Sequence, residues 1–334
     1  MAALSTFVSS VTQDRFIPKV VDSVLNGNVL TMRLMKSART WRGGVSIEVP
    51  VNLTSYTQLG SYSGFDAFST TQQNTRQKAS FTPSQVYASV AISGIQRAAN
   101  QGEAAVIDLV ATEMDQRALD LKDEMGTQVY GDGTGNSSKD ILGLQAAVDD
   151  STNIATYGGL SRSTYPNWQA TLTAQSGSLS LANLAADFDA AQHGNDSPTL
   201  IVTTPAVFSI YEALLTPTVS HQFSMNDFRM TGDGMAKVGG AIAANQGFRA
   251  LTFRGVPVVA DEKCTSGNIY TLNENHLFFY TLPNVQHKSD KSGFAWTGWK
   301  EPVNQDAVVG QLLWYGQLTT DSPRAHARRT GVTS

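Results

Sequence analysis

The stretch from Asn100 to Tyr130 constrains the fold most, because it predicts one long amphipathic helix. Apolar side chains recur there at spacings of three and four residues, so they share one face. These positions are Ile107, Val110, Met114, Ala118, Leu121 and Met125. Asn100 and Glu103 have the spacing of a capping box, and the turn-rich run GDGTGN at 131–136 ends the pattern. We predict a helix over residues 103–129 on which the rest of the chain is built.

The composition suggests a surface that contacts neighbours. Charged residues make up 16% of the 334-residue chain and hydrophobic residues 41%, whereas ordinary soluble proteins contain roughly 25% charged residues. The centres of protein interfaces are depleted in charge, so one interpretation is a surface covered by other subunits. A polar, uncharged, loop-rich exterior would give the same numbers, and composition leaves both readings open.

Charge and cysteine usage exclude several classes of function. A net charge of −4 excludes a global basic field for nucleic acid, and the single Cys264 excludes an internal disulfide or a multi-cysteine metal site. The basic run at 33–42, which includes Trp41, keeps a nucleic-acid contact as a less favoured alternative to a solvated face. With no recognisable secretory signal or membrane-length apolar run, we expect a soluble chain made in the cytoplasm and no membrane partner.

The segment 54–82 differs most from the rest of the chain. It is polar, turn-rich and nearly free of aliphatic residues, yet it contains Tyr56, Tyr62, Phe65 and Phe68. A structureless loop of this length is uncommon inside a compact domain, and disordered tracts are usually poor in aromatic residues. We therefore favour an extended hairpin that buries these side chains on another molecule over a disordered tract.

The remaining pattern predicts an α+β protein, because strands and helices occur in separate runs rather than in alternating βαβ units. The predicted strands cover 45–51, 86–92, 200–204, 251–260, 269–272, 277–282 and 308–319. Further helices are expected over 181–191, after the cap Ser180, and from Pro205 to Leu215. Residues 216–247 read as a loop poor in aliphatic residues, which contains Met225, Phe228, Met230 and Met235. The closing RAHARRT reads as a basic tail.

No pattern of catalytic or metal-binding residues is complete. The run GDGTG at 131–135 follows a helix and lacks the ending of a P-loop, and Thr134 stands where a calcium loop needs an acidic ligand. The five histidines have no metal spacing, and no Gly-x-Ser-x-Gly elbow is present. The acidic neighbours Asp261 and Glu262 would raise the pKa of the Cys264 thiol. We expect no catalytic residue, no metal and no cofactor.

Six stretches follow one another in a recognisable order. They are EMGTQVYGDGTG, ILGL, LIVTTPAVFSIYEALL, FRGVPVVADEKC, GNIYTLNENHLFFY and NQDAVVGQLLWYGQL. This order resembles the major capsid proteins of tailed bacteriophages, which have the Hong Kong-type fold. The resemblance covers most of the chain after Val45, and the order of the motifs carries it rather than any single motif.

The resemblance implies a phage capsid fold with five parts. Residues 1–45 would be an N-terminal arm, and 46–85 a strand with an extended loop. Residues 86–140 would form the peripheral domain around the long helix, 141–300 the axial domain, and 301–334 a return to the peripheral domain.

The resemblance also implies contact surfaces. The extended loop would lie over a neighbouring subunit through Tyr56, Tyr62, Phe65, Phe68 and Lys78. A covalent cross-link through Lys78 is conceivable, although a solvated lysine is the commoner case. The axial loop would meet its copies at capsomer centres through Met225, Phe228, Met230 and Met235.

The function implied by this resemblance is that of a shell subunit. Many copies would self-assemble in the host cytoplasm into the hexamers and pentamers of an icosahedral virion that encloses double-stranded DNA. Its partners would be itself, scaffolding, portal and decoration proteins, and packaged DNA bound without sequence specificity. The alternatives are an encapsulin-like bacterial compartment shell, against which the long arm argues, and a hydrolase or carbohydrate-binding α+β protein, which predicts a defined pocket.

Overall fold

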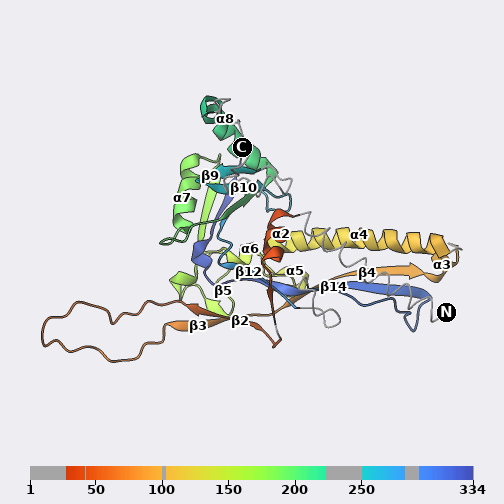
Figure 1. Cartoon of the computed structure of the whole chain (residues 1–334), viewed down its shortest axis with the longest axis horizontal. Helices are drawn as coiled ribbons and strands as arrows, with labels where there is room; N and C mark the ends of the chain where they lie inside the picture. The colour runs from red at the N-terminus through yellow and green to blue at the C-terminus, as the bar shows by residue number, and fades with distance from the viewer. Residues whose placement is uncertain (1–27, 42, 100–102, 223–249, 283–292, 334) are drawn as a thin grey trace, which may run out of the picture.

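The main parts of the described structure are two large sheets, one long helix and an outlying hairpin (Figure 1). The computed structural model describes residues 28–41, 43–99, 103–222, 250–282 and 293–333. The mixture of helices and strands confirms the predicted α+β class. Of the predicted arm at 1–45, residues 1–27 lie outside the described residues.

The five-stranded sheet is arranged around its longest strand, β14. Its strands are β1 (Arg39–Thr40), β4 (Ser84–Ser93), β12 (Leu277–Thr281), β13 (Phe294–Trp296) and β14 (Ala307–Thr320). β4 runs antiparallel along one side of β14, from the pair Ser93–Ala307 to the pair Ser84–Gly316. β12 and β13 pair with successive parts of the other side, and β1 extends β12 in parallel. The predicted strands 86–92, 277–282 and 308–319 are thus confirmed within two residues at each end.

The helix α4 (Glu103–Tyr130) confirms the helix predicted over 103–129 and lies along β4 (Figure 1). The predicted stripe is buried at Met114, Ala118, Leu121 and Met125, and Val129 extends it. The side chains of Ile107 and Val110 lie outside the described residues. The stripe shares one core with alternate side chains of β4, namely Val86, Val90 and Ile92. Because burying one such side chain contributes about 1.5–3 kcal/mol, the stripe fixes the helix to the sheet.

A glycine closes the C-terminal end of α4. A Cβ at Gly143 would lie 2.4 Å from the Gln128 carbonyl oxygen and 2.5 Å from that of Val129, so only glycine fits there. The Gln145 N–H then donates to the Gly131 carbonyl, at 3.1 Å. The short helices α5 (Gly135–Ser138) and α6 (Leu144–Ala147) flank this contact. The glycine turn ends the helix as predicted, and α3 (Gly94–Ala99) precedes α4.

The helix α2 (Val29–Lys36) uses the basic run for contacts within the subunit. Arg33 donates twice to the Glu274 carboxylate, each time at 2.6 Å, and the Arg39 guanidinium lies 3.5 Å from the centre of the Phe278 ring. A Cβ at Gly126 of α4 would lie 2.1 Å from the Asn28 amide nitrogen, so the start of α2 packs closely on α4. Two of the basic side chains at 33–42 therefore already have partners.

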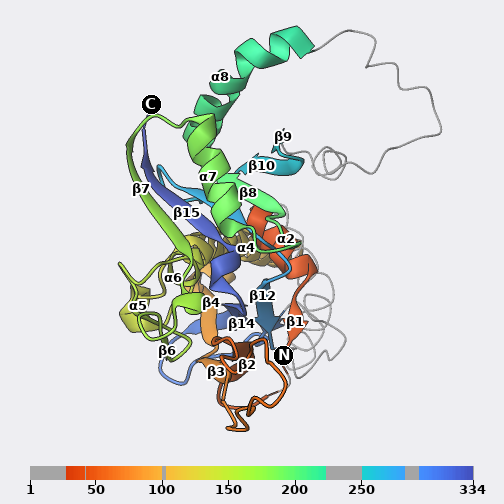
Figure 2. The same ribbon diagram turned by 90° about the vertical axis from the view of Figure 1, so that its left-hand side faces the viewer.

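The six-stranded sheet has the order β7–β15–β11–β8–β10–β9. Its strands are β7 (Thr171–Gly177), β8 (Leu200–Thr203), β9 (Ala250–Phe253), β10 (Val256–Ala260), β11 (Ile269–Leu272) and β15 (Ala327–Val332). The helices α7 (Leu181–Ala191) and α8 (Pro205–Gln222) lie against it (Figure 2). Ser180 caps α7 as predicted, because its hydroxyl accepts from the Asn183 N–H at 3.2 Å.

Three sequence predictions in this region were wrong. The basic tail is the strand β15, in which Arg329 donates to the Asp187 carboxylate of α7 at 2.6 and 2.7 Å. The strand predicted over 251–260 is the β9–β10 hairpin, whose turn at Arg254 and Gly255 has φ of 50° and 83°. Residues 216–222, predicted as loop, continue α8, and the part of that loop at 223–249 lies outside the described residues.

A buried arginine organises the segment between α6 and β7. Arg162 donates to the carbonyls of Trp168, Ile154, Ala146 and Ala147 at 2.6–3.3 Å. Trp168 is buried and donates to the Tyr157 carbonyl at 2.9 Å. The segment also contains β5 (Thr156–Tyr157), β6 (Leu160–Ser161) and η1 (Pro166–Trp168), and η2 (Pro323–Ala325) precedes β15.

The strand β2 (Ile47–Asn52) confirms the strand predicted over 45–51 and pairs with β3 (Arg76–Phe81) in a hairpin. The segment 54–82 supplies β3 and most of the loop of this hairpin, and its burial on another molecule stays a prediction. Residues 53–75 connect the two strands and project far from the body of the subunit (Figure 1). The Ser80 N–H donates to the Gly158 carbonyl at 2.8 Å, so the base of the hairpin is attached to the segment that Arg162 organises.

Candidate assembly surfaces

The loop 53–75 exposes all four of its predicted contact aromatics. Tyr56 is 42% exposed, Tyr62 66%, Phe65 107% and Phe68 68%. Tyr62 and Phe68 meet edge to face with ring centres 4.9 Å apart, so the structure brings these two together, close to the outer end of the loop. Exposed aromatic side chains of this kind are typical of surfaces that bind another molecule, and their role between subunits stays a prediction.

Polar side chains join the two sides of this loop. The Thr57 N–H donates to the Gln73 side-chain oxygen at 3.0 Å, and the Gln73 amide nitrogen donates back to the Thr57 hydroxyl at 2.7 Å. Nearer the tip, the Ser63 N–H donates to the Asp66 carboxylate at 2.7 Å. These bonds shape the loop without covering its aromatic rings.

Lys78 does not lie with the aromatic side chains. It is on β3 and pairs with Glu48 of β2 at 2.6 Å, with both side chains at least half exposed. An exposed pair of this kind contributes about 0–1 kcal/mol. The structure thus gives Lys78 a partner within its own hairpin, and its role between subunits stays a prediction.

A second surface, which the sequence analysis missed, is the face of β4 and β14 turned away from α4. Its side chains are all uncharged: Gln85, Tyr87, Ser89, Ala91, Val309, Gln311, Leu313 and Tyr315. Tyr87 is 69% exposed and lies opposite Leu313. The signal was present, because an alternating strand that places tyrosine and no charge on its outer face is unusual for a solvated sheet. We call this set the outer sheet face.

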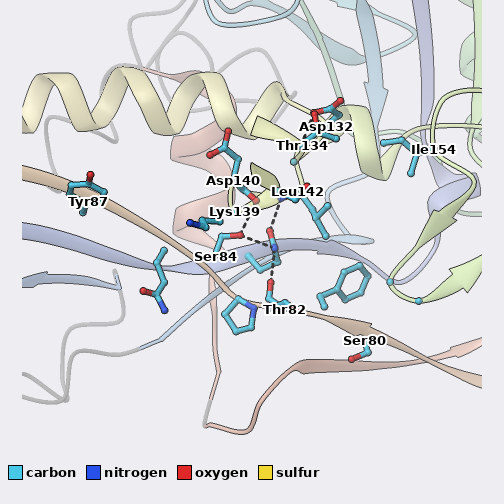
Figure 3. A pocket seen from close by; sticks show the side chains of 18 residues that line it. Ser80, Thr82, Ser84, Tyr87, Asp132, Thr134, Lys139, Asp140, Leu142 and Ile154 are labelled. Atoms are coloured by element: carbon cyan, nitrogen blue, oxygen red, sulfur yellow. Dashed lines mark hydrogen bonds between the residues drawn. The ribbon is translucent and has the colours of Figure 1, made fainter. Parts of the chain in front are cut away.

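A hollow of about 830 Å³ lies beside the beginning of β4 (Figure 3). The Gln317 amide nitrogen donates to the Thr82 carbonyl at 2.8 Å and to the Ser84 hydroxyl at 3.1 Å. On its other wall Asp132 accepts from the backbone N–H and the hydroxyl of Thr134, and these bonds lower the pKa of that carboxyl. These bonds therefore favour the ionised form of Asp132.

The other features considered in the sequence are metal ligands, the Cys264 thiol, membrane-spanning helices and the axial contacts. Among the described residues no group of three or more His, Cys, Asp or Glu side chains could hold a metal ion. Cys264 is buried, and burial, followed by the charge of Asp261, raises the pKa of its thiol far above the usual range. None of the described helices is long and apolar enough to cross a membrane. The predicted axial contacts Met225, Phe228, Met230 and Met235 lie outside the described residues.

Solved shell structures contain chains with a similar overall fold. A chain of the cyanophage A-1(L) capsid asymmetric unit is 17% identical, with a TM-score of 0.69 over 92% of this chain and 94% of that one. The chain has the fold of a phage capsid protein. The capsid of a native GTA particle also matches, at 13% identity and a TM-score of 0.54 over 90% of both chains.

A compartment shell shares the fold less completely. The SrpI encapsulin from Synechococcus elongatus PCC 7942 is 13% identical, with a TM-score of 0.51 over 77% of this chain and 76% of that one. No protein-family model matches the sequence, and no curated protein sequence matches it significantly. The likeness to solved shells therefore rests on structure and confirms the resemblance as one of fold.

Proposed function

We propose that this chain is the major capsid protein of a tailed phage, a subunit whose copies form the hexamers and pentamers of an icosahedral shell around double-stranded DNA. The observation that carries the proposal is the match to a phage capsid chain over 92% of this chain. The exposed aromatic loop supports it, because a monomer gains nothing from four aromatic rings in water.

The loop supplies a contact between subunits. Each aromatic side chain can bury roughly 150–250 Å². At about 25 cal/mol per Å², a few hundred Å² of burial contributes several kcal/mol for each subunit. The outer sheet face of a neighbouring copy is a suitable acceptor, because it is uncharged, the loop carries one charged residue, Asp66, and both surfaces bring aromatic and polar side chains together. Lys78 and the four axial-loop residues are proposed as further contacts.

The shell would be completed by scaffolding, portal and decoration proteins and assembled in the host cytoplasm. Packaged DNA would lie near the subunit without sequence-specific binding. On the described part of α4 the acidic side chains outnumber the basic ones, and Arg117 is already paired with Asp120 at 2.6 Å. Phosphate contacts along that part of α4 are therefore unfavourable, because they need an excess of basic side chains.

The second candidate is an encapsulin-like shell that encloses a cargo protein. It is supported by a structural match of its own, but that match has the lower TM-score, 0.51 against 0.69, and covers less of the chain. The two functions predict different contents for the same kind of particle.

Electron microscopy with analysis of the particle contents tests both candidates. We expect the concentrated chain, or particles from its natural source, to form closed shells in which this chain is the most abundant protein by mass spectrometry. DNA inside native particles supports the phage function, and a single enriched cargo protein supports the compartment. A chain that stays monomeric under all assembly conditions and is only a trace component of native particles would contradict both.

A further inference from the structure

Two of the places where the chain crosses between the two large sheets lie next to each other. The turn at 273–276 leads from β11 of the six-stranded sheet to β12 of the five-stranded sheet. Residues 321–326 lead from β14 back to β15. The backbone N–H of Asp321 donates to the carbonyl of His276 at 3.4 Å, so the two crossings touch. The junction is therefore one of the places where the two sheets are joined.

His276, in the first crossing, has a carboxylate at each ring nitrogen. Its Nδ1 lies 2.7 Å from the Asp321 carboxylate in the second crossing, and its Nε2 contacts the Asp196 carboxylate just before β8. Both carboxylates accept, so both contacts are hydrogen bonds only when both nitrogens carry a proton. The geometry is therefore that of an imidazolium ion between two carboxylates. It joins three segments that are far apart in the sequence.

Two further ionisable groups of the crossings, His326 and Glu274, are neutral and paired respectively. His326 is buried, its Nδ1 accepts from the Asn273 N–H at 3.2 Å, and its Nε2 lies 3.2 Å from the Thr320 hydroxyl. Burial lowers the pKa of His326 to about 3, so this ring is neutral. Glu274 is paired with Arg33 of α2. The Asn273 amide donates to the second oxygen of Asp196 at 2.7 Å and holds that carboxylate in place.

The balance of effects on His276 favours its charged form. Burial alone would lower its pKa, but the hydrogen bonds and negative charges of Asp321 and Asp196 raise the pKa above the ordinary value. A group whose pKa is raised by folding stabilises the fold fully at pH values below its pKa in the unfolded chain, which is about 6.5 for histidine. That contribution is lost as the pH rises through the pKa of the group in the folded protein.

We propose that His276 is a proton-dependent clamp that fixes the angle between the two sheets. With both ring nitrogens protonated, it holds the two crossings and the segment before β8 together. When one proton passes to water, one carboxylate loses its donor, two negative charges share a neutral ring, and the sheets can change their relative angle. This property belongs to the single subunit and goes beyond the shell function.

A distance measurement between the two sheets tests the clamp. Spin labels would be attached to cysteines introduced at the exposed positions Leu119 on α4 and Ala186 on α7. The full chain would carry Cys264→Ser, so that only these two cysteines are labelled. We expect a narrow distance distribution near pH 6, where a raised-pKa histidine is charged, and a broader or shifted one near pH 9. The same distribution at both pH values in the unaltered junction overturns the proposal.

Two variants separate the clamp from packing. His276→Gln carries no titratable proton and should give the pH 9 distribution at both pH values. The matched control is His193→Gln, an exposed histidine whose Nε2 bonds only the Arg324 carbonyl and whose backbone pairs with Asp196. It should keep the full pH response. A narrow distribution in His276→Gln near pH 6, or loss of the response in His193→Gln, contradicts the proposal. If His276→Gln does not fold, the pH series on the unaltered junction decides.

Discussion

The helix α4 buries its apolar side chains, whereas the loop 53–75 exposes its aromatic ones. Met125 of α4 is fully buried, whereas Phe65 of the loop is 107% exposed. The helical stripe meets β4 within the same subunit, while the contacts of the loop aromatics stay inside the loop: Tyr62 meets Phe68, and the Tyr56 hydroxyl donates to Gln58 at 3.0 Å. A periodic apolar pattern thus identifies side chains that are buried within the subunit. An aromatic segment without such a pattern suggests burial against another molecule.

The largest expected effect is on the helix. Met114→Pro removes a helical hydrogen bond and clashes with the preceding turn, which costs about 3 kcal/mol or more. Loss of the buried methionine adds roughly 2–5 kcal/mol, against a typical stability of about 5–15 kcal/mol. We expect no cooperatively folded subunit by circular dichroism melting. The matched control Met114→Leu should cost less than about 1.5 kcal/mol. A proline variant that melts cooperatively would show that α4 does not organise the fold.

The next largest effect is on assembly rather than on folding. Replacing residues 55–74 by a short Gly/Ser linker leaves the β2–β3 ladder and the Lys78–Glu48 pair intact. We expect an unchanged melting temperature, because none of the replaced residues belongs to the hydrophobic core. We also expect no stable shells by sedimentation or microscopy. Free subunits should be cut in this loop by protease, and particles should be protected. Normal shells would remove the loop from assembly, and an unfolded subunit would place it in the core.

A matched pair of phenylalanines sharpens the same comparison. Phe279 is buried and stacks on Trp314 with ring centres 5.2 Å apart, whereas Phe65 is exposed. Phe279→Ala should lower the unfolding free energy by about 3–5 kcal/mol, and Phe65→Ala should change it by less than about 0.5 kcal/mol. Only Phe65→Ala should impair assembly while leaving the subunit folded. The measurement is the protein concentration needed to form shells, which should rise. Equal melting temperatures for the two variants would contradict the comparison.

The smallest effect is expected at Cys264. Its thiol is buried, its pKa is raised by burial, and its sulfur lies 3.8 Å from the Thr265 and Asn268 carbonyls. Cys264→Ser places a hydroxyl beside the same acceptors and should cost no more than about 1 kcal/mol. Particle yield and morphology should equal those of the unchanged protein. Lost particles despite normal subunit melting would reveal a role for the thiol in assembly.

The sequence predicted what depends on neighbours along the chain. The stripe of α4, the Ser180 cap and the hairpin at 47–81 follow from spacing and composition. It failed where the partner is remote. Nothing near Arg329 indicates Asp187, which lies 142 positions away, so β15 read as a basic tail.

The junction and the outer sheet face were missed for the same kind of reason. His276 bonds to carboxylates 80 and 45 positions away, and no local pattern shows that these three side chains meet. The face that holds Tyr87 depends on its pairing with Leu313 of β14. A single strand shows which residues alternate, but its partner strand decides how large an uncharged surface results.

The position of β15 has a consequence for how each subunit is made. This strand lies between β7 and β11, which share no ladder with one another. The ribosome has therefore completed nearly all of the described chain before the second sheet can close. Until then the edges of β7 and β11 are open to other strands, and open edges favour aggregation. When many copies are synthesised at once, these open edges remain exposed in each chain until residues 327–332 have been made.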